Sequence, residues 1–438
     1  MRSVQGHRAP ALSDQKSSSA TCARTERPQD DARDRSALSE SLKGLKHPGR
    51  RALRECGVRG RTTAAALVRR SLGGQEFDAK DNSLNLLRLV LAALVIVAHS
   101  FITGGFGDGP QIKGLNLGGW AVYGFFVASG YLIAGSRLSG GLGRYLVLRV
   151  ARIYPGFLAN LALTAGVIAP IVYWHAHGSV RGYLGADTTP LRYVVGNITL
   201  LMVNYDIAGT PGGVPYPLAW NGSLWSLAFE FACYLIVGFS LCVVVFRRHM
   251  RAFSVAAFGV SCLVAAQAPG VLVTAGAPAV LASFASQLAQ LVPFFVAGVL
   301  LYSFRDVVRY CLLGAIISAT AASALILFVP EMGPQMSAPL LAYVIFFLAS
   351  VLPCPGVIKR EDVSYGVYIY GFIVEQILAL CHVHGYGYLI YMLASLCLTV
   401  PLAVGSWRFI EKPAMRFARN AVISRSVSTS PDAANARK

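Results

Sequence analysis

The sequence LRLVLAALVIVAHSF, residues 87–101, is almost entirely apolar but carries Arg88 near its start and His99 near its end. A charged side chain at bilayer depth costs about 2.5–3.5 kcal/mol on insertion scales, so such residues usually face a protein interior or a water-filled cavity. Eleven residues separate the two, which on an α-helix is a rise of about 16 Å and a net rotation of about 20°. We therefore predict a spanning helix with both polar side chains on one face.

The composition places the whole chain among polytopic membrane proteins. Of its 438 residues, 55% are hydrophobic and 14% are charged, whereas soluble domains usually carry about 25% charged residues. The net charge of +18 does not indicate nucleic-acid binding, because much of the excess lies in residues 1–76, which lack aromatic side chains for base stacking. We predict that residues 1–76 form a disordered, basic cytoplasmic extension and that the chain binds no nucleic acid.

Apolar runs of about 17–25 residues, the length that crosses a bilayer, recur from residue 84 onward. They predict an all-α integral membrane protein whose partner is the lipid bilayer, with about ten transmembrane helices near residues 84–103, 118–139, 153–175, 224–246, 252–268, 288–304, 309–329, 338–353, 363–382 and 387–409. The run 270–284 is interrupted by glycine and proline, and we interpret it as an outer loop or a re-entrant piece.

Lysine and arginine gather in alternate connections between these spans. If the N-terminus is cytoplasmic, the inner connections include the basic segments 137–152, 247–251 and 305–309, and the outer connections hold few positive charges. This asymmetry follows the positive-inside rule. We expect both termini in the cytoplasm, Arg88 at the inner end of its helix and His99 near the outer end.

Two further charged motifs lie at or within the spans. Arg149 and Arg152 are three residues apart and share a helix face, which favours either a phosphate-binding site or ordinary positive-inside topology. Ser226 and Glu230 are four apart and also share a face. A carboxylate inside a span is a functional-site hypothesis by default, with a structural ion pair as the alternative. Glu230 lies in the outer half by this topology and could orient His99 as a general base.

Aromatic and acidic residues in the outer halves of the spans suggest an acceptor site. Trp225 suits a membrane interface, and Tyr368 and Glu375 share one face of the ninth span. These side chains could line a sugar site, and a packing role is an equal alternative. We expect no bound metal, because the H-x-H pairs at 175–177 and 382–384 suit the interface without a ligand role.

Six motifs in order carry a resemblance to a known family: LNLLRLVLAALVIVAHS with its R-x10-H spacing, YGFFVASGYLI, LRVARIYP with R-x-x-R, SLWSLAFEFACYL, SYGVYIYGF and FIEKPAMRF. Residues 77–417 resemble the membrane acyltransferase family 3, the bacterial O-acyltransferases that modify surface polysaccharides and other sugars. The resemblance implies a ten-helix domain in the bacterial inner membrane. It also implies transfer of acyl groups, usually acetyl from cytoplasmic acetyl-CoA, to an extracytoplasmic glycan.

The resemblance also gives roles to individual residues. Arg88 and His99 match the family's essential R-x10-H pair. Arg149 and Arg152 match its R-x-x-R pair, and Glu230 matches the glutamate of its W-S-x-x-x-E segment. We therefore expect three groups of site residues: catalytic His99 and Glu230; donor-binding Arg88, Arg149 and Arg152; and acceptor-binding Trp225, Ser226, Tyr368 and Glu375.

The sequence departs from the family pattern in three places. Asn85 stands where many members have aspartate, and Gly371 stands where many have histidine after the tyrosines. Nothing after Pro413 resembles the extracytoplasmic domain fused to some members, so transfer would finish in the membrane domain or with a separate extracytoplasmic partner. Residues 418–438 are predicted to form a polar cytoplasmic tail.

An alternative from a different class is a polytopic transporter or flippase for a glycan or a lipid-linked intermediate. It too would line a path through the membrane with polar residues such as Arg88, His99 and Glu230. It predicts solute movement without cleavage of a thioester, so the two classes differ in an observable reaction.

Cysteine labelling tests the predicted orientation. In a cysteine-free background, an impermeant thiol reagent added from outside should label Ala186→Cys, in the outer connection 178–223, and should not label Ala252→Cys at an inner helix end. Labelling of both positions in permeabilised cells is the control for access. Labelling of position 252 alone in intact cells would overturn the orientation.

Overall fold

The computed structural model describes residues 74–276 and 278–428. The predictions for residues 1–73 of the basic extension and for residues 429–438 of the tail lie outside this range. The described part is mainly helical, with one short antiparallel hairpin formed by β1 (Gln111–Ile112) and β2 (Leu115–Asn116). The predicted all-α class is confirmed.

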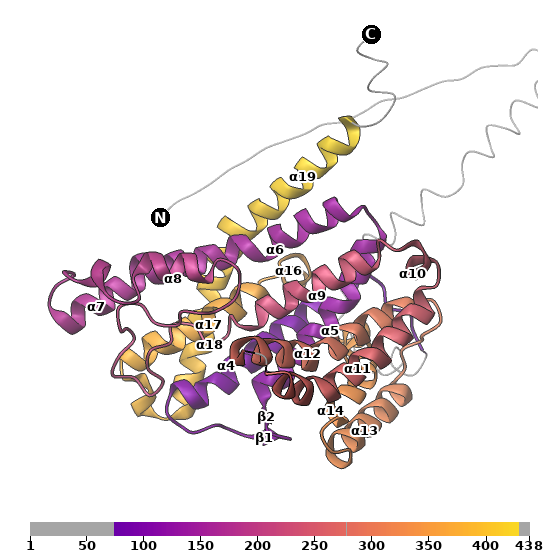
Figure 1. Ribbon diagram of the computed structural model, residues 1–438, viewed down its shortest axis with the longest axis horizontal. Coiled ribbons are helices and arrows are strands. Elements are labelled where there is room, and N and C mark those ends of the chain that lie inside the picture. The colour runs from indigo at the N-terminus through magenta and orange to yellow at the C-terminus, as the bar shows by residue number, and fades with distance from the viewer. Residues whose placement is uncertain (1–73, 277, 429–438) are drawn as a thin grey trace, which may run out of the picture. The chain divides into compact units, whose positions relative to one another are not determined.

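The helices follow one another as Figure 1 shows. The longer ones are α4 (Leu84–Thr103), α5 (Leu117–Leu138), α6 (Leu142–Leu163), α7 (Ala169–His177), α8 (Pro190–Asn197), α9 (Ser226–Ser240), α11 (Met250–Thr274), α12 (Ala279–Ser303), α13 (Leu312–Phe328), α15 (Ala338–Val351), α17 (Ser364–Leu380), α18 (Tyr388–Ser406) and α19 (Lys412–Ser428). The shorter ones are η1 (Thr164–Ile168), η2 (Tyr183–Gly185), α10 (Val244–Arg248), α14 (Gly333–Met336), α16 (Gly356–Arg360), η3 (Val383–Tyr386) and η4 (Trp407–Glu411).

Within the described residues, six helices are long and apolar enough to cross a membrane: Leu84–Thr103, Leu117–Leu138, Leu142–His177, Met250–Ala268, Ala279–Ser303 and Tyr388–Ile423. Four others, α9, α13, α15 and α17, are apolar but shorter. Each of the ten predicted spans overlaps one of these helices. A helix of 15 residues, such as α9, rises about 22 Å, less than the roughly 30 Å of bilayer hydrocarbon, so a shorter helix needs adjoining residues to complete a crossing.

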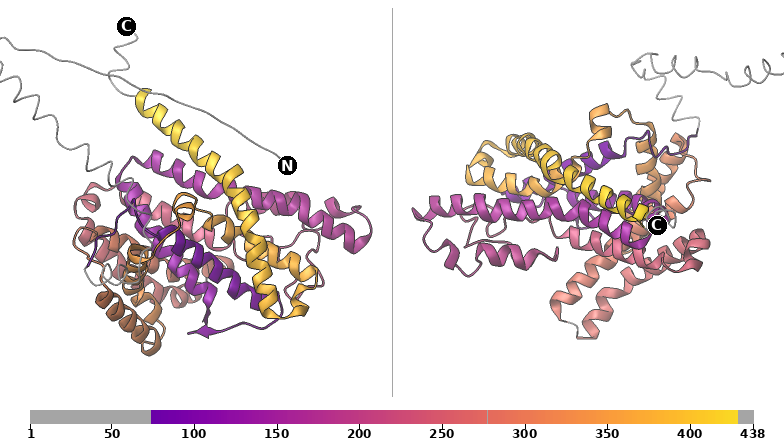
Figure 2. Two further views of the ribbon diagram at one scale, coloured as in Figure 1. Left: turned by 180° about the vertical axis from the view of Figure 1, so that it is seen from behind. Right: turned by 90° about the horizontal axis from the view of Figure 1, so that it is seen from above.

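The prediction of a loop or re-entrant piece at 270–284 is wrong. The helix α11 continues to Thr274 and α12 begins at Ala279, so most of this run belongs to two long helices that pack side by side (Figure 2). Gly270 lies within α11, whereas Gly276, with a φ of +63°, and Pro278, the residue before α12, lie between the two helices. The last helical stretch is also longer than predicted, because α19 continues to Ser428 and makes the first part of the expected tail 418–438 helical.

Glycines let α5 pack closely against α12. A Cβ atom built at Gly130 would lie 1.9 Å from the carbonyl oxygen of Phe295, and one at Gly298 would lie 2.1 Å from that of Val127. Both distances are far inside van der Waals contact, so only glycine fits at these positions. Small residues commonly allow such close helix packing in membrane proteins.

Buried amides tie the long connection between α8 and α9 into the bundle. Asn221 donates a hydrogen bond to the carbonyl oxygen of Ile369 in α17, and Asn160 in α6 donates to the same oxygen, each at 2.7 Å. The Tyr368 hydroxyl donates to the carbonyl oxygen of Ser223 at 2.7 Å. These bonds fix the start of α9 against α6 and α17, and so position the polar side chains of α9.

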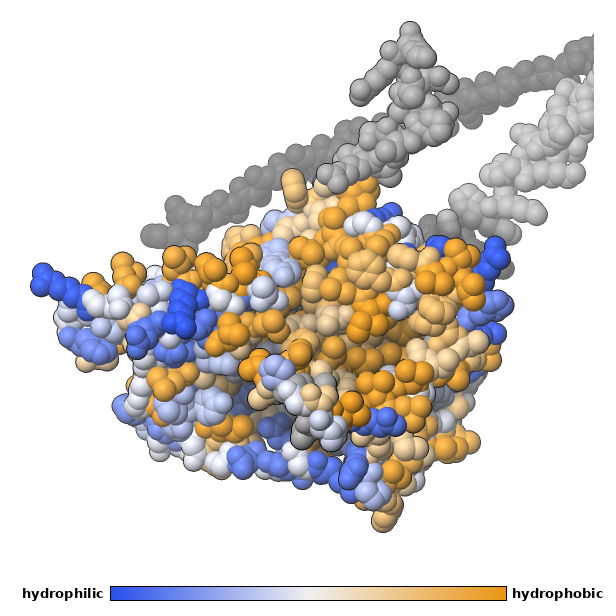
Figure 3. Space-filling model, in the orientation of Figure 1, coloured by the Kyte–Doolittle hydropathy of each residue, from blue (hydrophilic) through white to orange (hydrophobic). Residues whose placement is uncertain are grey.

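The surface around the long helices is strongly apolar. Figure 3 shows apolar side chains over much of the face around α9 and α11, and hydrophilic side chains along its lower and left edges. Exposed side chains on these helices include Ile236 and Phe239 of α9 and Val260 and Leu263 of α11. Soluble monomers rarely expose apolar patches of this kind, which agrees with a protein whose outer surface is covered by lipid.

The variant Gly130→Ala should destabilise the contact between α5 and α12, because even a methyl group overlaps the Phe295 carbonyl. Overpacking of this kind typically costs about 1–3 kcal/mol, so we expect the Tm of the detergent-solubilised protein to fall by several degrees. The control is Gly259→Ala in α11, where an added Cβ meets no atom within 4 Å. Equal Tm values for the two variants, measured by thermal-shift chromatography, would contradict the close approach.

Candidate functional site

The residues Arg88 and His99 lie on one unbroken helix, α4. Both side chains face the α17 region: Arg88 donates a hydrogen bond to Asp362, just before α17 begins, and the His99 ring centroid is 5.2 Å from that of Phe372 within α17. The predicted shared face is confirmed. The rise of the helix separates the two positions by about 16 Å. The Arg88 side chain is mostly buried, with 14% of its surface exposed, and His99 is half-buried.

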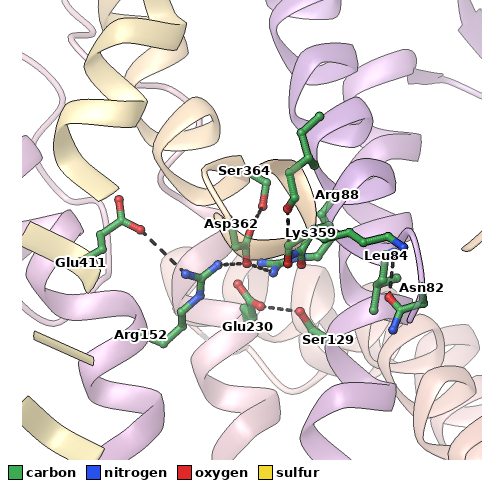
Figure 4. A network of polar contacts seen from close by, with 12 residues as sticks. Asn82, Leu84, Arg88, Ser129, Arg152, Glu230, Lys359, Asp362, Ser364 and Glu411 are labelled. Carbon is green, nitrogen blue, oxygen red and sulfur yellow. Dashed lines mark hydrogen bonds and ion pairs between the residues drawn. The ribbon is translucent and has the colours of Figure 1, made fainter. Parts of the chain in front are cut away.

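The carboxylate of Asp362 joins two arginines from different helices (Figure 4). Its Oδ2 atom accepts hydrogen bonds from Nη1 of Arg88 in α4 and from Nη2 of Arg152 in α6, the latter at 2.5 Å, and Ser364 donates to Oδ1 at 2.6 Å. Burial raises the pKa of Asp362, but Arg152, Arg88 and the Ser364 hydrogen bonds outweigh it and hold that pKa well below its usual range. The carboxylate is therefore ionised at physiological pH.

The Arg152 side chain is held from several sides. Its Nη1 atom lies 3.8 Å from Oε2 of Glu411 in η4. Its guanidinium carbon lies 5.6 Å from the ring centre of Tyr365 and 5.7 Å from that of Trp407, within the range of cation–π attraction. Arg152 therefore has charged and aromatic neighbours from both α17 and the C-terminal helices.

The Arg149 side chain has different surroundings, although it lies only one turn earlier on α6. Its guanidinium carbon is 5.9 Å from the ring centre of Tyr234 in α9, and its Nε atom is buried with no hydrogen-bond partner in the described part of the chain. The Tyr234 hydroxyl donates to Oε1 of Glu230 at 2.5 Å, and Ser129 of α5 donates to the same oxygen at 2.6 Å. A second polar chain thus runs from Arg149 to α5.

A small cavity connects these two polar groups. Arg88 and Glu230 line it together with Tyr365 and with Ser226 and Tyr368, whose hydroxyl oxygens are 2.5 Å apart. The predicted shared face of Ser226 and Glu230 is confirmed by this cavity. Its volume of about 30 Å³ is room for about one water molecule. A larger group can enter only if the helices around it separate.

The structure does not bring His99 and Glu230 into contact. The Glu230 carboxylate is bonded to Ser129 and Tyr234, and among the described residues no hydrogen bond joins it to His99. The suggestion that Glu230 orients His99 therefore has no contact to support it, because Glu230 is turned toward the Arg88 cavity. The catalytic role of each residue stays a prediction.

The predicted acceptor-binding residues lie in three different places. Ser226 and Tyr368 line the cavity that Arg88 enters, and Trp225 lines a neighbouring apolar cavity. Glu375 is fully buried, and its carboxylate accepts a hydrogen bond from Ser100 of α4 at 2.9 Å. Glu375 therefore ties α17 to α4 in this conformation instead of facing an open site.

Four residues that the sequence did not single out for chemistry belong to these polar groups: Ser129, Tyr234, Asp362 and Glu411. The sequence motifs already pointed to the neighbourhood of two of them, because Asp362 lies two residues before SYGVYIYGF and Glu411 lies within FIEKPAMRF. Spacing along the chain does not reveal that both carboxylates meet the same arginine of α6.

Both single-residue departures from the family pattern have a physical explanation. The Nδ2 atom of Asn85 donates to the carbonyl oxygens of Ile358 at 3.3 Å and Lys359 at 3.1 Å, bonds that an ionised aspartate cannot donate. A Cβ atom built at Gly371 would lie 2.7 Å from Cγ1 of Ile96 in α4. In this protein α4 therefore occupies the space that a side chain at position 371 would need.

Comparisons with known proteins cover most of the described helices. Residues 81–408 match a family model described as an acyltransferase domain. The O-acetyl transferase of Shigella phage Sf6 is 28% identical over 357 residues, 76% of this chain and 96% of that protein. Nodulation protein 10 of Rhizobium leguminosarum bv. viciae is 26% identical over 374 residues, 79% of this chain and 96% of that protein. No solved structure matches the chain.

The variant Gly371→His should be destabilised, because its side chain would collide with Ile96 where α17 packs on α4. We expect a clear fall in Tm and partial recovery in the double variant Gly371→His/Ile96→Ala, since the second change removes the obstructing atoms. Ile96→Ala alone is the control for the cavity that it creates. A Gly371→His protein as stable as the wild type would show that this contact does not exclude the family's histidine.

Proposed function

Since the chain belongs to the membrane acyltransferase family 3, we propose that this acyltransferase moves an acetyl group from cytoplasmic acetyl-CoA to a hydroxyl of an extracytoplasmic carbohydrate, such as a surface polysaccharide. The acetyl group is supported by the likeness to the phage Sf6 O-acetyl transferase. The donor and the carbohydrate acceptor follow from the resemblance of the motifs to the family.

One observation carries the proposal. The helix α4 holds Arg88 in a buried cluster of arginines near one end and His99 about 16 Å away toward the other. An anionic donor on one side of a membrane and a hydroxyl acceptor on the other need a path between them, and these two residues would mark about 16 Å of it. The pantetheine arm of the donor is long and flexible and could extend along α4 from Arg88 toward His99.

Arg88, Arg149 and Arg152 form the proposed donor-binding end. No ion pair involves Arg149 within the described residues, so its guanidinium is free to bind a phosphate with two parallel hydrogen bonds. Arg152 is already paired with Asp362 and adds positive potential next to that site. In this proposal Glu230, which lines the cavity with Arg88, contacts the acyl arm, and a direct role beside His99 would require rearrangement.

In this proposal His99 is the general base. It takes the proton of the acceptor hydroxyl while the hydroxyl oxygen attacks the carbonyl carbon of the thioester. The tetrahedral intermediate collapses, the carbon–sulfur bond breaks, and the acetyl ester forms. CoA leaves as a thiolate and receives the proton that His99 had taken. General-base catalysis of this kind contributes about 10²–10⁴-fold.

We place the enzyme in the bacterial inner membrane, with ten crossings and both termini in the cytoplasm. The six long apolar helices would supply six crossings, and the four shorter ones, completed by adjoining residues, would supply the rest. The alternating basic connections support this orientation. Arg88 then lies on the donor side and His99 on the acceptor side.

Purified protein in lipid nanodiscs, given isotopically labelled acetyl-CoA and surface glycans, tests the proposal directly. Acetylated glycan, detected by mass spectrometry together with release of free CoA, is the expected result. Movement of glycan across a vesicle membrane without loss of thioester would instead favour the transporter alternative.

The variant His99→Ala should abolish transfer while leaving CoA binding nearly normal, because His99 lies on the acceptor side of the proposed path. We expect residual activity near background, within the roughly 10²–10⁴-fold loss of a general base. Arg88→Ala should instead weaken the binding or positioning of the donor. Calorimetry in detergent and transfer assays at matched expression separate the two effects. Transfer by His99→Ala above about a tenth of wild type, far outside that range, would exclude His99 as the base.

A further inference from the structure

The orientation of Arg88 depends on one carboxylate. Among the described residues its ion pair is with Asp362, and its Nε atom is buried without a hydrogen-bond partner. The two residues are 274 positions apart in the chain. The direction of the Arg88 side chain is therefore set by the position of Asp362 in the segment that precedes α17.

The neighbouring Arg152 does not depend on Asp362 in the same way. Besides the hydrogen bond to Asp362, Arg152 lies 3.8 Å from Glu411 and faces two aromatic rings. Loss of the charge at position 362 would leave Arg152 with its other neighbours, whereas Arg88 would lose the ion pair that holds it. Figure 4 shows this asymmetry: Arg152 lies between the carboxylates of Glu411 and Asp362, whereas Arg88 lies beside Asp362 alone.

The backbone that presents Asp362 is itself firmly held. The preceding residue, Glu361, accepts hydrogen bonds from Lys412 at 2.5 Å and from the indole of Trp407, and these bonds lower the pKa of Glu361. On the other side, Ser364 donates to the second oxygen of Asp362. Asp362 is therefore presented from a segment fixed to the C-terminal helices.

The position of Arg88 matters because its side chain lines the cavity that also contains Glu230. A buried guanidinium without its carboxylate carries a large desolvation cost. It would either turn toward the membrane surface or pair with Glu230, and both movements would change the walls of the cavity.

We propose that Asp362 is a positioning residue that acts through Arg88, holding the guanidinium at the Glu230 cavity in the geometry that receives the acyl donor. This inference rests on the proposed acyl transfer. Asp362 does not touch the reacting atoms, so it is not a catalytic residue. A purely structural ion pair would hold the helices together, and its loss would reduce the amount of folded protein without changing how the folded enzyme meets its donor.

Steady-state kinetics with acetyl-CoA distinguish the two roles. Asp362→Asn keeps the side-chain size but removes the charge, and Arg88→Gln removes the guanidinium. We expect both variants to change the same parameter, either the KM for acetyl-CoA or kcat, by at least about tenfold. The double variant should lose no more activity than the more impaired single variant, because both changes remove the same interaction. Asp362→Glu, which restores the charge, should recover part of the activity.

Two further variants test whether the effect is specific to Arg88. Asp306→Asn removes a carboxylate from an ion pair with Arg251 whose side chains are 61% and 50% exposed. Exposed pairs contribute little, so this control should behave as wild type. In the double variant of Asp362→Asn with Arg152→Gln, the two fold-losses in activity should come close to multiplying, because Arg152 keeps other neighbours. In the double variant of Asp362→Asn with Arg88→Gln they should not multiply.

Size-exclusion chromatography of each sample gives the amount of folded protein for the kinetics, and the Tm gives its thermal stability. Two results would overturn the inference. One is a double variant in which the fold-losses of Asp362→Asn and Arg88→Gln multiply, and the other is a normal KM and kcat per folded molecule in Asp362→Asn. If Asp362→Asn does not fold, Asp362→Glu supplies the kinetic test, and wild-type values there would also overturn it. Wild-type protein that transfers no acetyl group would overturn the proposed function instead. In that case the Tm values of Asp362→Asn, Arg88→Gln and their double variant still test the contact, because additive losses in Tm would show that Asp362 does not hold Arg88.

Discussion

Two arginines share one carboxylate oxygen inside a bundle of apolar helices, and the arrangement of the site depends on this contact. Burying each ion costs several kcal/mol, and the cost is recovered only when the geometry and the remaining hydrogen bonds are good. Two guanidinium groups so close together would repel each other without the charge of Asp362. The start of α17 must therefore lie between α4 and α6, and the polar residues on these helices take their positions from that requirement.

The same contact explains why the Glu230 cavity is small. Arg88 is drawn to Asp362 at one side, Glu230 is bonded to Ser129 and Tyr234 at another, and hydroxyl groups close the space between them. In the proposed reaction the donor and the acceptor approach from opposite sides of a membrane, and such an enzyme must avoid an open water path when it is empty. A cavity with room for about one water molecule meets that need, and under the proposed reaction the donor arm would enter it only with movement of the surrounding side chains or helices.

Much of the fold could be read from local patterns. Apolar length located the helices, and helical spacing placed Arg88 and His99 on one face and Ser226 and Glu230 on another, because these relations depend only on the geometry of a single helix. The errors arose where local signals have two meanings. The run 270–284 was interpreted as a loop or re-entrant piece, but most of it belongs to the ends of α11 and α12, with Gly276 and Pro278 between them. A topology-based depth for Glu230 suggested contact with His99, but the turn of α9 within the bundle directs its carboxylate toward Arg88.

The sequence by itself determined that this protein is an all-α membrane acyltransferase with a charged residue and a histidine on one helix face, since composition, periodicity and motif order are properties of the chain. Only the tertiary structure decided which charges meet. Asp362 lies 274 residues from Arg88 and 210 from Arg152, and no spacing rule connects positions so far apart. Their pairing follows from helix packing in a medium of low dielectric, where buried charges must find partners, and packing brings α4, α6 and the start of α17 to the same point.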